Sequence, residues 1–202
     1  MKNLSSVFIG MILFFGVAQA ETKKTKLPEN SIYQIKSKWV DQDGQTISMS
    51  DLSGKPVAIS MIYLTCKFSC PVTVAHMKDL EKMLSPKIKS EVQFVLVSFD
   101  PERDTPENMK KFAEKNKLEA PRWRFLTSKK EQDLREFSTL IDFKYKKTED
   151  GEFEHSFGIV ALDSQGRILG STIGAEMKEK ELVPLFEKNN KIFFRAIKKY
   201  HM

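Results

Sequence analysis

The stretch V-A-I-S-M-I-Y-L at residues 57–64, followed by T-C-K-F-S-C-P at residues 65–71, decides the fold of this chain. Its apolar run predicts a strand that is buried on both faces. Val74, Leu80 and Leu84 then follow at helical spacing. We therefore expect both cysteines of the chain, Cys66 and Cys70, to lie where a buried strand passes into a helix, near the N-terminus of that helix.

The rest of the chain alternates between strand and helix patterns. The run V-Q-F-V-L-V-S-F at residues 92–99 predicts a second buried strand, and Thr105 and Pro106 fit the N-cap and first position of a helix that ends near Asn116. Further strands are expected at 31–36, 46–49, 123–126, 141–146, 157–162 and 167–172, helices at 129–140 and 178–200, and a charged loop at 147–154. This order predicts an α/β fold: a thioredoxin-like sandwich with a central mixed β-sheet and flanking helices.

The first 20 residues predict that the protein is exported. Residues 1–20 read as a signal peptide, with Lys2 before an apolar core at 7–17 and Ala18-Gln19-Ala20 as a cleavage site. That core is shorter than the roughly 20 residues that a membrane span needs; an uncleaved anchor is the alternative. We expect residues 21–30 to form a flexible tether, and 31–202 to form one domain that includes the C-terminal helix. The mature protein is then a soluble, periplasmic monomer.

The charge is basic but dispersed. The net charge is +6 with a pI near 9.1, and the lysines are interleaved with acidic residues. This pattern favours an ordinary solvated surface over nucleic-acid binding. The basic end of the C-terminal helix leaves a weak contact with a membrane surface as a minor alternative.

An exported protein with two cysteines invites a structural disulfide. A bridge between Cys66 and Cys70 closes only a five-residue loop, which stabilises by about 2 kcal/mol in the chain-entropy model. A domain of this size can build its core without such a bridge. We therefore favour a functional role for the pair over a structural one.

Two thiols at a helix N-terminus suit either a reversible disulfide or a soft metal ion. The helix dipole favours thiolate, and thiolate sulfur selects Cu(I) or zinc. One of three histidines could supply a third donor. His76 is six residues after Cys70 and on another helical face, His201 is next to the end of the chain, and His155 precedes a predicted strand. From the residues alone, a solvated role remains an alternative for each.

Three segments, taken in order, resemble the Sco/SenC family of thioredoxin-like copper proteins linked to cytochrome c oxidase assembly. They are T-C-K-F-S-C-P at 65–71, V-S-F-D-P-E-R-D-T-P at 97–106, and His155 with the strand that follows it. The resemblance covers about 31–174. It implies that Cys66, Cys70 and His155 bind copper, as Cu(I) and in many members also as Cu(II). It assigns no ligand role to His76 or His201.

The chain departs from the family between the cysteines, where many members carry proline and this one has Lys67-Phe68-Ser69. The positive charge of Lys67 favours thiolate and disfavours Cu(II). Many members also keep a transmembrane anchor, whereas this leader has a cleavage site. The similar thioredoxin-type oxidoreductases place a cis-proline opposite the dithiol, but no proline occurs between Pro121 and Pro184, where His155 lies.

The leading hypothesis is an exported copper metallochaperone. It would bind one copper through Cys66, Cys70 and His155 and deliver it to a cuproprotein, the binuclear copper site of a cytochrome c oxidase subunit. One alternative is a thiol–disulfide oxidoreductase, with Cys66 and Cys70 as its redox pair, that keeps the acceptor's copper-ligand cysteines reduced. Another is an interaction protein whose docking surface senses copper or redox state.

Overall fold

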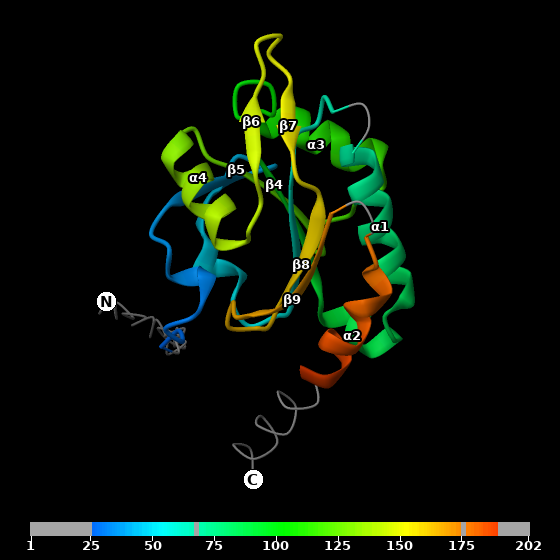
Figure 1. Cartoon of the computed structure of the whole chain (residues 1–202). Helices are drawn as coiled ribbons and strands as arrows, with labels where there is room; N and C mark the ends of the chain where they lie inside the picture. Colours follow the sequence, from blue (N-terminus) through cyan, green and yellow to red (C-terminus); the bar gives the residue numbers. More distant parts are fainter. Residues whose placement is uncertain (1–25, 67–68, 175–176, 190–202) are drawn as a thin grey trace, which may run out of the picture.

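The computed structural model describes residues 26–66, 69–174 and 177–189 (Figure 1). At its centre, β3 (Val57–Ile62) pairs in parallel with β4 (Gln93–Ser98), which pairs in parallel with β5 (Trp123–Thr127). All six residues of β3 are buried, as expected for a strand covered on both faces. The predictions from the two apolar runs are confirmed.

The remaining strands of the main sheet each pair in antiparallel fashion with their neighbours. On one side, β8 (Gly158–Leu162) pairs with β3 and forms a hairpin with β9 (Ile168–Ile173). On the other side, β1 (Lys38–Asp41) pairs with β5 and with β2 (Thr46–Ser48). The order is β2-β1-β5-β4-β3-β8-β9, so the sheet is mixed, as predicted.

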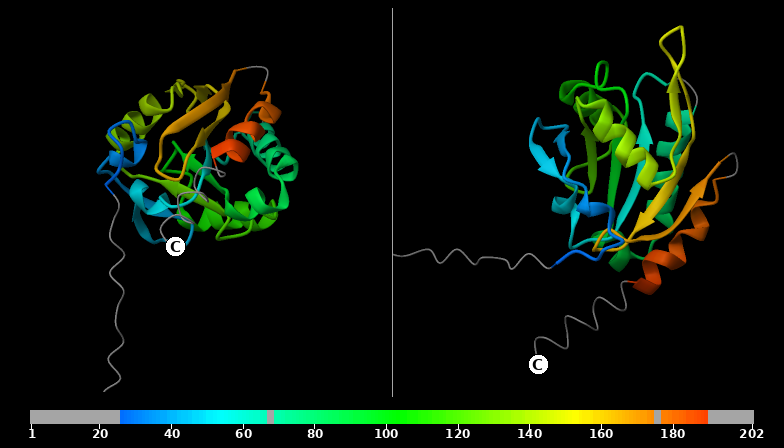
Figure 2. Two further views of the ribbon diagram at one scale, coloured as in Figure 1. Left: turned by 90° about the horizontal axis from the view of Figure 1, so that it is seen from below. Right: turned by 60° about the vertical axis from the view of Figure 1, so that its left-hand side comes forward.

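Helices cover both faces of this sheet. Figure 2 shows α4 (Glu131–Leu140) on one face, and α1 (Ser69–Met83) and α3 (Pro106–Lys115) on the other. Phe137 of α4 packs edge-on against Trp39 of β1, and Phe112 of α3 packs edge-on against Phe125 of β5. The predicted N-cap is confirmed, because the hydroxyl of Thr105 accepts a hydrogen bond from the Asn108 amide. These layers form the predicted α/β sandwich.

A second, two-stranded sheet extends beyond the main one. It consists of β6 (Tyr145–Lys147) and β7 (Phe153–His155), an antiparallel hairpin that projects from the body of the molecule (Figure 1). The sequence prediction of a strand at 141–146 and a charged loop at 147–154 was therefore wrong in its boundaries. The charged residues form a turn that connects two short strands, and His155 lies at the end of a strand rather than in a loop.

Other differences from the sequence prediction lie near the ends. Residues 31–36 do not form a strand, because Ser31 caps the 3₁₀ turn η1 (Ile32–Gln34) by accepting a hydrogen bond from the Tyr33 amide. A second 3₁₀ turn, η2 (Met49–Leu52), follows β2, and the short helix α2 (Pro86–Glu91), which was not expected, precedes β4.

The C-terminal helix agrees with the prediction only in part. The 3₁₀ turn η3 (Glu179–Glu181) leads into a helix over residues 183–189. The predicted continuation to residue 200, the leader at 1–20 and half of the tether (21–25) lie outside the described residues. Within the described residues, none of the helices combines the length and the apolar character that crossing a membrane requires.

Candidate metal centre

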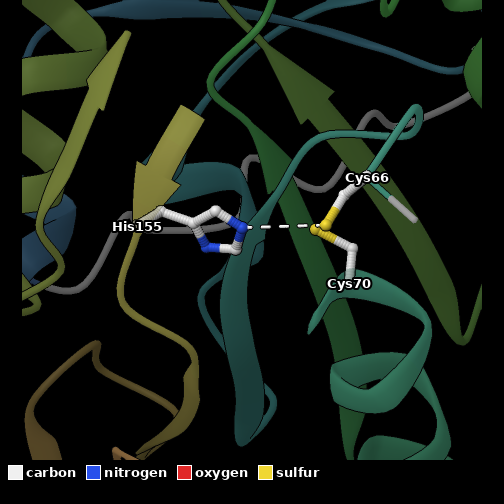
Figure 3. A group of neighbouring side chains, drawn as sticks. All are labelled: Cys66, Cys70 and His155. Atoms are coloured by element: carbon white, nitrogen blue, oxygen red, sulfur yellow. Dashed lines mark hydrogen bonds between the residues drawn. The ribbon is translucent and has the colours of Figure 1, made fainter. Parts of the chain in front are cut away.

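Two thiols and one imidazole meet at one edge of the main sheet (Figure 3). Cys66 lies in the turn after β3, where its amide donates to the carbonyl of Tyr63, and Cys70 lies in the first turn of α1. His155 is the last residue of β7. The two Sγ atoms and one ring nitrogen of His155 all lie within 4.8 Å of one another. The distance from Cys66 Sγ to His155 Nε2 is 3.8 Å.

The topology explains why residues so distant in sequence meet. Parallel strands β3 and β4 end at the same edge of the sheet, and the loop with Cys66 leaves from that edge. Strand β8 runs antiparallel to β3, so it begins at this edge. Because β8 starts at Gly158, only three residues after His155, the histidine lies at the same edge. The carboxyl ends of parallel strands are the usual place for ligand sites in open α/β sheets. The sheet therefore brings the thiols and the imidazole together.

The hydrogen bonding of His155 fixes which ring nitrogen can bind a ligand. Its Nδ1 lies 2.5 Å from the carbonyl oxygen of Ser156. A carbonyl oxygen only accepts hydrogen bonds, so the proton of the neutral imidazole is on Nδ1. The lone pair is then on Nε2, which faces Cys66. Backbone carbonyls orient metal-ligating histidines in this way in many proteins.

Aromatic rings hold the imidazole in place. The ring of Phe143 stacks on that of His155 with centroids 5.9 Å apart, and the rings of Phe99 and Tyr63 contact it at 5.3 and 5.5 Å. Phe153, two residues before the histidine, packs on both Phe99 and Tyr63. This aromatic wall fills the space between the hairpin and the main sheet, so His155 has an apolar support behind it.

Both cysteines are buried, and burial changes the acidity of Cys70. Cys70 is 2% exposed and Cys66 is 8% exposed. Burial raises the pKa of the Cys70 thiol well above its usual range, and the nearby Cys66 raises it further; the hydrogen bond from the Tyr63 amide, 3.3 Å from Sγ, opposes this only in part. The expectation of a thiolate at the helix N-terminus was therefore wrong for Cys70, because burial raises its pKa more than the Tyr63 amide lowers it.

This arrangement supports two kinds of chemistry. Sulfur and imidazole nitrogen are the donors that soft metals prefer, and within the described residues these three form the only group of potential ligands this close together. The donor set therefore fits copper. The two cysteines are not bonded to each other in a disulfide but lie within reach of one another, so forming that disulfide is the second kind of chemistry.

The two aspartates of the D-P-E-R-D segment lie outside this donor group. Asp100 forms an ion pair with Arg103 and is 2% exposed on its side chain. Asp104 is fully buried, and its Oδ2 accepts hydrogen bonds from the Leu64 amide at 3.0 Å and the Ser98 hydroxyl at 2.6 Å. Asp104 thus connects the end of β4 to the segment that leads into Cys66.

His76, the other histidine within the described residues, lies outside this donor group. Nδ1 of His76 pairs with Oε2 of Glu179 at 2.8 Å, which joins α1 to η3. His201 lies outside the described residues. The sequence interpretation of His76 as a non-ligand agrees with this position.

Sequence reasoning missed the side chains that surround the donors. The Tyr63 hydroxyl donates to Glu152 Oε2 at 3.1 Å and is in hydrogen-bond contact with the Cys66 thiol. Burial and these two neighbours raise the pKa of Tyr63. Arg103 was quoted as part of a motif, but nothing in the sequence indicated its partners.

Comparisons with known proteins agree with this fold and donor set. The chain is 31% identical over 180 residues to the SCO1 protein homolog of Bacillus subtilis, covering 87% of this chain and 91% of that protein. A SCO1/SenC family lipoprotein from Bacillus anthracis superposes with a TM-score of 0.68 at 28% identity, covering 76% of this chain and 92% of that one.

A third comparison is with BsSco, described as a member of the Sco family of cytochrome c oxidase assembly proteins in which a disulfide switch was identified. It superposes with a TM-score of 0.66 at 27% identity, covering 84% of this chain and 99% of that one. The SCO1/SenC family model matches residues 26–187. With most of its length matched by this model, the chain belongs to the SCO1/SenC family.

Proposed function

We propose that this protein is an exported copper metallochaperone, which binds one copper ion through Cys66, Cys70 and His155 and delivers it to a cuproprotein. The observation that carries the proposal is the convergence of two Sγ atoms and one imidazole nitrogen within 4.8 Å. The binuclear copper site of a cytochrome c oxidase subunit is the acceptor we propose, because BsSco is described as an assembly protein of that enzyme.

The donors suit Cu(I) in particular. Two thiolates alone can hold Cu(I), and a third donor makes the site more retentive. His155 presents its Nε2 lone pair without a further proton transfer, since Nδ1 carries the proton. The two thiols lose their protons on binding, so loading releases protons. Cu(II) binding is part of the proposal only as a secondary state.

Transfer requires that a second protein reach the ion. His155 is half-buried, and Cys66 is more exposed than Cys70, at 8% against 2%. We propose that the acceptor enters from the side of Cys66 and His155 while Cys70 remains a ligand to the end. The leader pattern at residues 1–20 supports export, which puts the protein in the compartment where such acceptors are assembled.

The decisive experiment is a copper titration of the reduced protein with a competing Cu(I) chelator. We expect about one copper per chain, weaker retention in His155→Ala, and little retention in Cys66→Ser or Cys70→Ser. His76→Ala is the matched control, because His76 lies further along α1 and its imidazole pairs with Glu179 of η3. Equal affinity of His155→Ala and the wild type would exclude His155 from the site. Transfer to an apo-acceptor, followed in the same assay, tests delivery.

A second function is favoured by the short distance between the two thiols. As a thiol–disulfide oxidoreductase, the protein would reduce an oxidised dithiol in an acceptor while Cys66 and Cys70 become a disulfide, with two electrons and two protons passing to the acceptor. Either cysteine variant would abolish this activity, but His155→Ala would largely spare it. Parallel assays of reduction and copper transfer on that variant distinguish the two functions.

A further inference from the structure

Arg103 joins the end of β4 to the hairpin β6–β7. Its Nε pairs with Oδ2 of Asp100, which lies two residues after the end of β4. Its Nη1 pairs with Oε1 of Glu152 at 3.1 Å, and its Nη2 donates to the carbonyl of Gly151, also at 3.1 Å. Gly151 and Glu152 precede β7. One guanidinium group therefore uses all three of its nitrogens to connect two segments that are about 50 residues apart.

The same guanidinium lies over two rings of the aromatic wall. Its Cζ is 5.5 Å from the centroid of Tyr63 and 5.7 Å from that of Phe153. The Tyr63 hydroxyl donates to the second oxygen of Glu152. The Glu152 carboxylate therefore has two partners: Tyr63, just after β3, binds one oxygen, and Arg103, just after β4, binds the other.

The hairpin needs such an anchor. It pairs over only three positions, from Tyr145–His155 to Lys147–Phe153, and it belongs to a separate sheet. A two-stranded hairpin is at best marginally stable by itself in water. The end of the hairpin near the main sheet is fixed where Phe153 and His155 of β7 pack against Phe99 and Tyr63. At the turn of the hairpin, Arg103 binds Gly151 and Glu152. Arg103 is itself fixed by its ion pair with Asp100, whose side chain is only 2% exposed.

From these contacts we propose that Arg103 is a positioning residue for the metal centre: it fixes the hairpin β6–β7 against the end of β4 so that His155 stays over the two thiols. The hydrogen bonds of Arg103 go to Asp100, Gly151 and Glu152, so it acts through the hairpin whose second strand carries the histidine. The inference rests on the proposed copper function for one of its two tests, and on the metal-free protein for the other.

The choice of substitution follows from the contacts. Arg103→Ala would leave the buried Asp100 carboxylate without its cation, which could unfold the region for an unrelated reason. Arg103→Lys keeps a positive charge beside Asp100 but lacks the planar fork needed to reach Glu152 and Gly151 together. Glu152→Ala removes the other end of the link and leaves the Asp100–Arg103 pair intact. Arg122→Lys is the matched control, because Arg122 pairs with Glu81 just before β5, at the opposite edge of the sheet.

The first test is hydrogen–deuterium exchange of the reduced, metal-free protein. We expect Arg103→Lys and Glu152→Ala to speed exchange of the amides at residues 145–155 several-fold while leaving β3 and β4 unchanged, and Arg122→Lys to leave the hairpin at the wild-type rate. Wild-type exchange of the hairpin in both variants would overturn the proposal, whether or not the protein binds copper.

The second test is a double-mutant cycle on copper loss to a chelator. We expect Arg103→Lys to release copper about tenfold faster than the wild type, the lower end of the usual effect of residues that orient metal ligands. In a His155→Ala background the same substitution should change nothing, because it acts only through the imidazole. An equal effect in both backgrounds would contradict the proposal and assign Arg103 to the thiols or to general stability.

Discussion

The hydroxyl of Ser98 donates to Oδ2 of Asp104 at 2.6 Å, whereas Oδ1 of the same carboxyl has no hydrogen-bond partner among the described residues. The side chain is fully buried, and this burial raises the pKa of Asp104 from 3.8 to about 6. A carboxyl whose folded pKa is raised contributes stability below its unfolded pKa, and this contribution is lost as the pH rises through the folded pKa. Asp104 should therefore lower the free energy of unfolding between about pH 4 and pH 7.

Asp104→Asn should remove this pH dependence. The amide oxygen can still accept from Ser98 and from the Leu64 amide, but the side chain no longer titrates. Relative to the wild type, we expect the variant to gain about 2 kcal/mol in the free energy of unfolding between pH 4.5 and pH 7. Urea unfolding at both values measures it; a constant difference between the two proteins would show that Asp104 does not carry the shift.

Copper affinity should rise with pH. The pKa of Cys70 is raised by burial, so the metal must displace a proton from a thiol that holds it tightly. Mass action then predicts an apparent affinity that increases about tenfold per pH unit for each proton displaced. Chelator competition on the wild-type protein from pH 6 to 8 measures the slope. A flat profile would mean that the thiols are already ionised in the free protein.

Gly158 is required by the close approach of β8 and β9. A Cβ at this position would lie 2.2 Å from the carbonyl oxygen of Thr172, and φ is +155°. We expect Gly158→Ala to lower the free energy of unfolding by about 2 kcal/mol or more. Gly170→Ala is the control, because there the nearest atom is the movable Cδ1 of Leu185 at 2.8 Å. Equal losses in the two variants would contradict this prediction.

The Tyr63 hydroxyl should contribute more to stability than the Tyr33 hydroxyl does. Tyr63→Phe keeps the ring in the aromatic wall but loses the hydrogen bond to Glu152 and the contact with Cys66. We expect a loss of about 1 kcal/mol in stability and faster copper release. Tyr33→Phe should be neutral or stabilising, because the buried Tyr33 hydroxyl has no partner within the described part of the chain. Thermal unfolding of both variants makes the comparison.

The elements predicted correctly are those whose signal is local. The apolar runs of β3 and β4, the Thr105–Pro106 start of α3 and the β8–β9 hairpin each depend on residues adjacent in sequence. The strand expected at 31–36 was wrong because the Ser31 hydroxyl accepts a hydrogen bond from the Tyr33 amide and starts a 3₁₀ turn instead. Such competition between a side chain and the backbone is hard to weigh without the tertiary contacts.

The candidate site could be predicted only in part from the residues themselves. The residues alone indicated a dithiol at a strand–helix junction, but they left three histidines as candidates. His155 was singled out by the family resemblance, and the fold then explains the choice, since antiparallel pairing of β8 with β3 returns the chain to the edge where Cys66 lies. The roles of Arg103 and Glu152 could not be predicted, because a contact across 49 positions leaves no local pattern.

The separation of the two sheets has one more consequence. The sulfurs belong to the large sheet and its first helix, whereas the nitrogen belongs to a ribbon that shares no ladder with that sheet. The nitrogen can therefore depart while every backbone pair of the large sheet stays closed. In a copper carrier, this permits a handover in stages: an incoming protein replaces the imidazole first, and the ion remains bridged between two sulfurs until a new donor has arrived, so it never passes free through water.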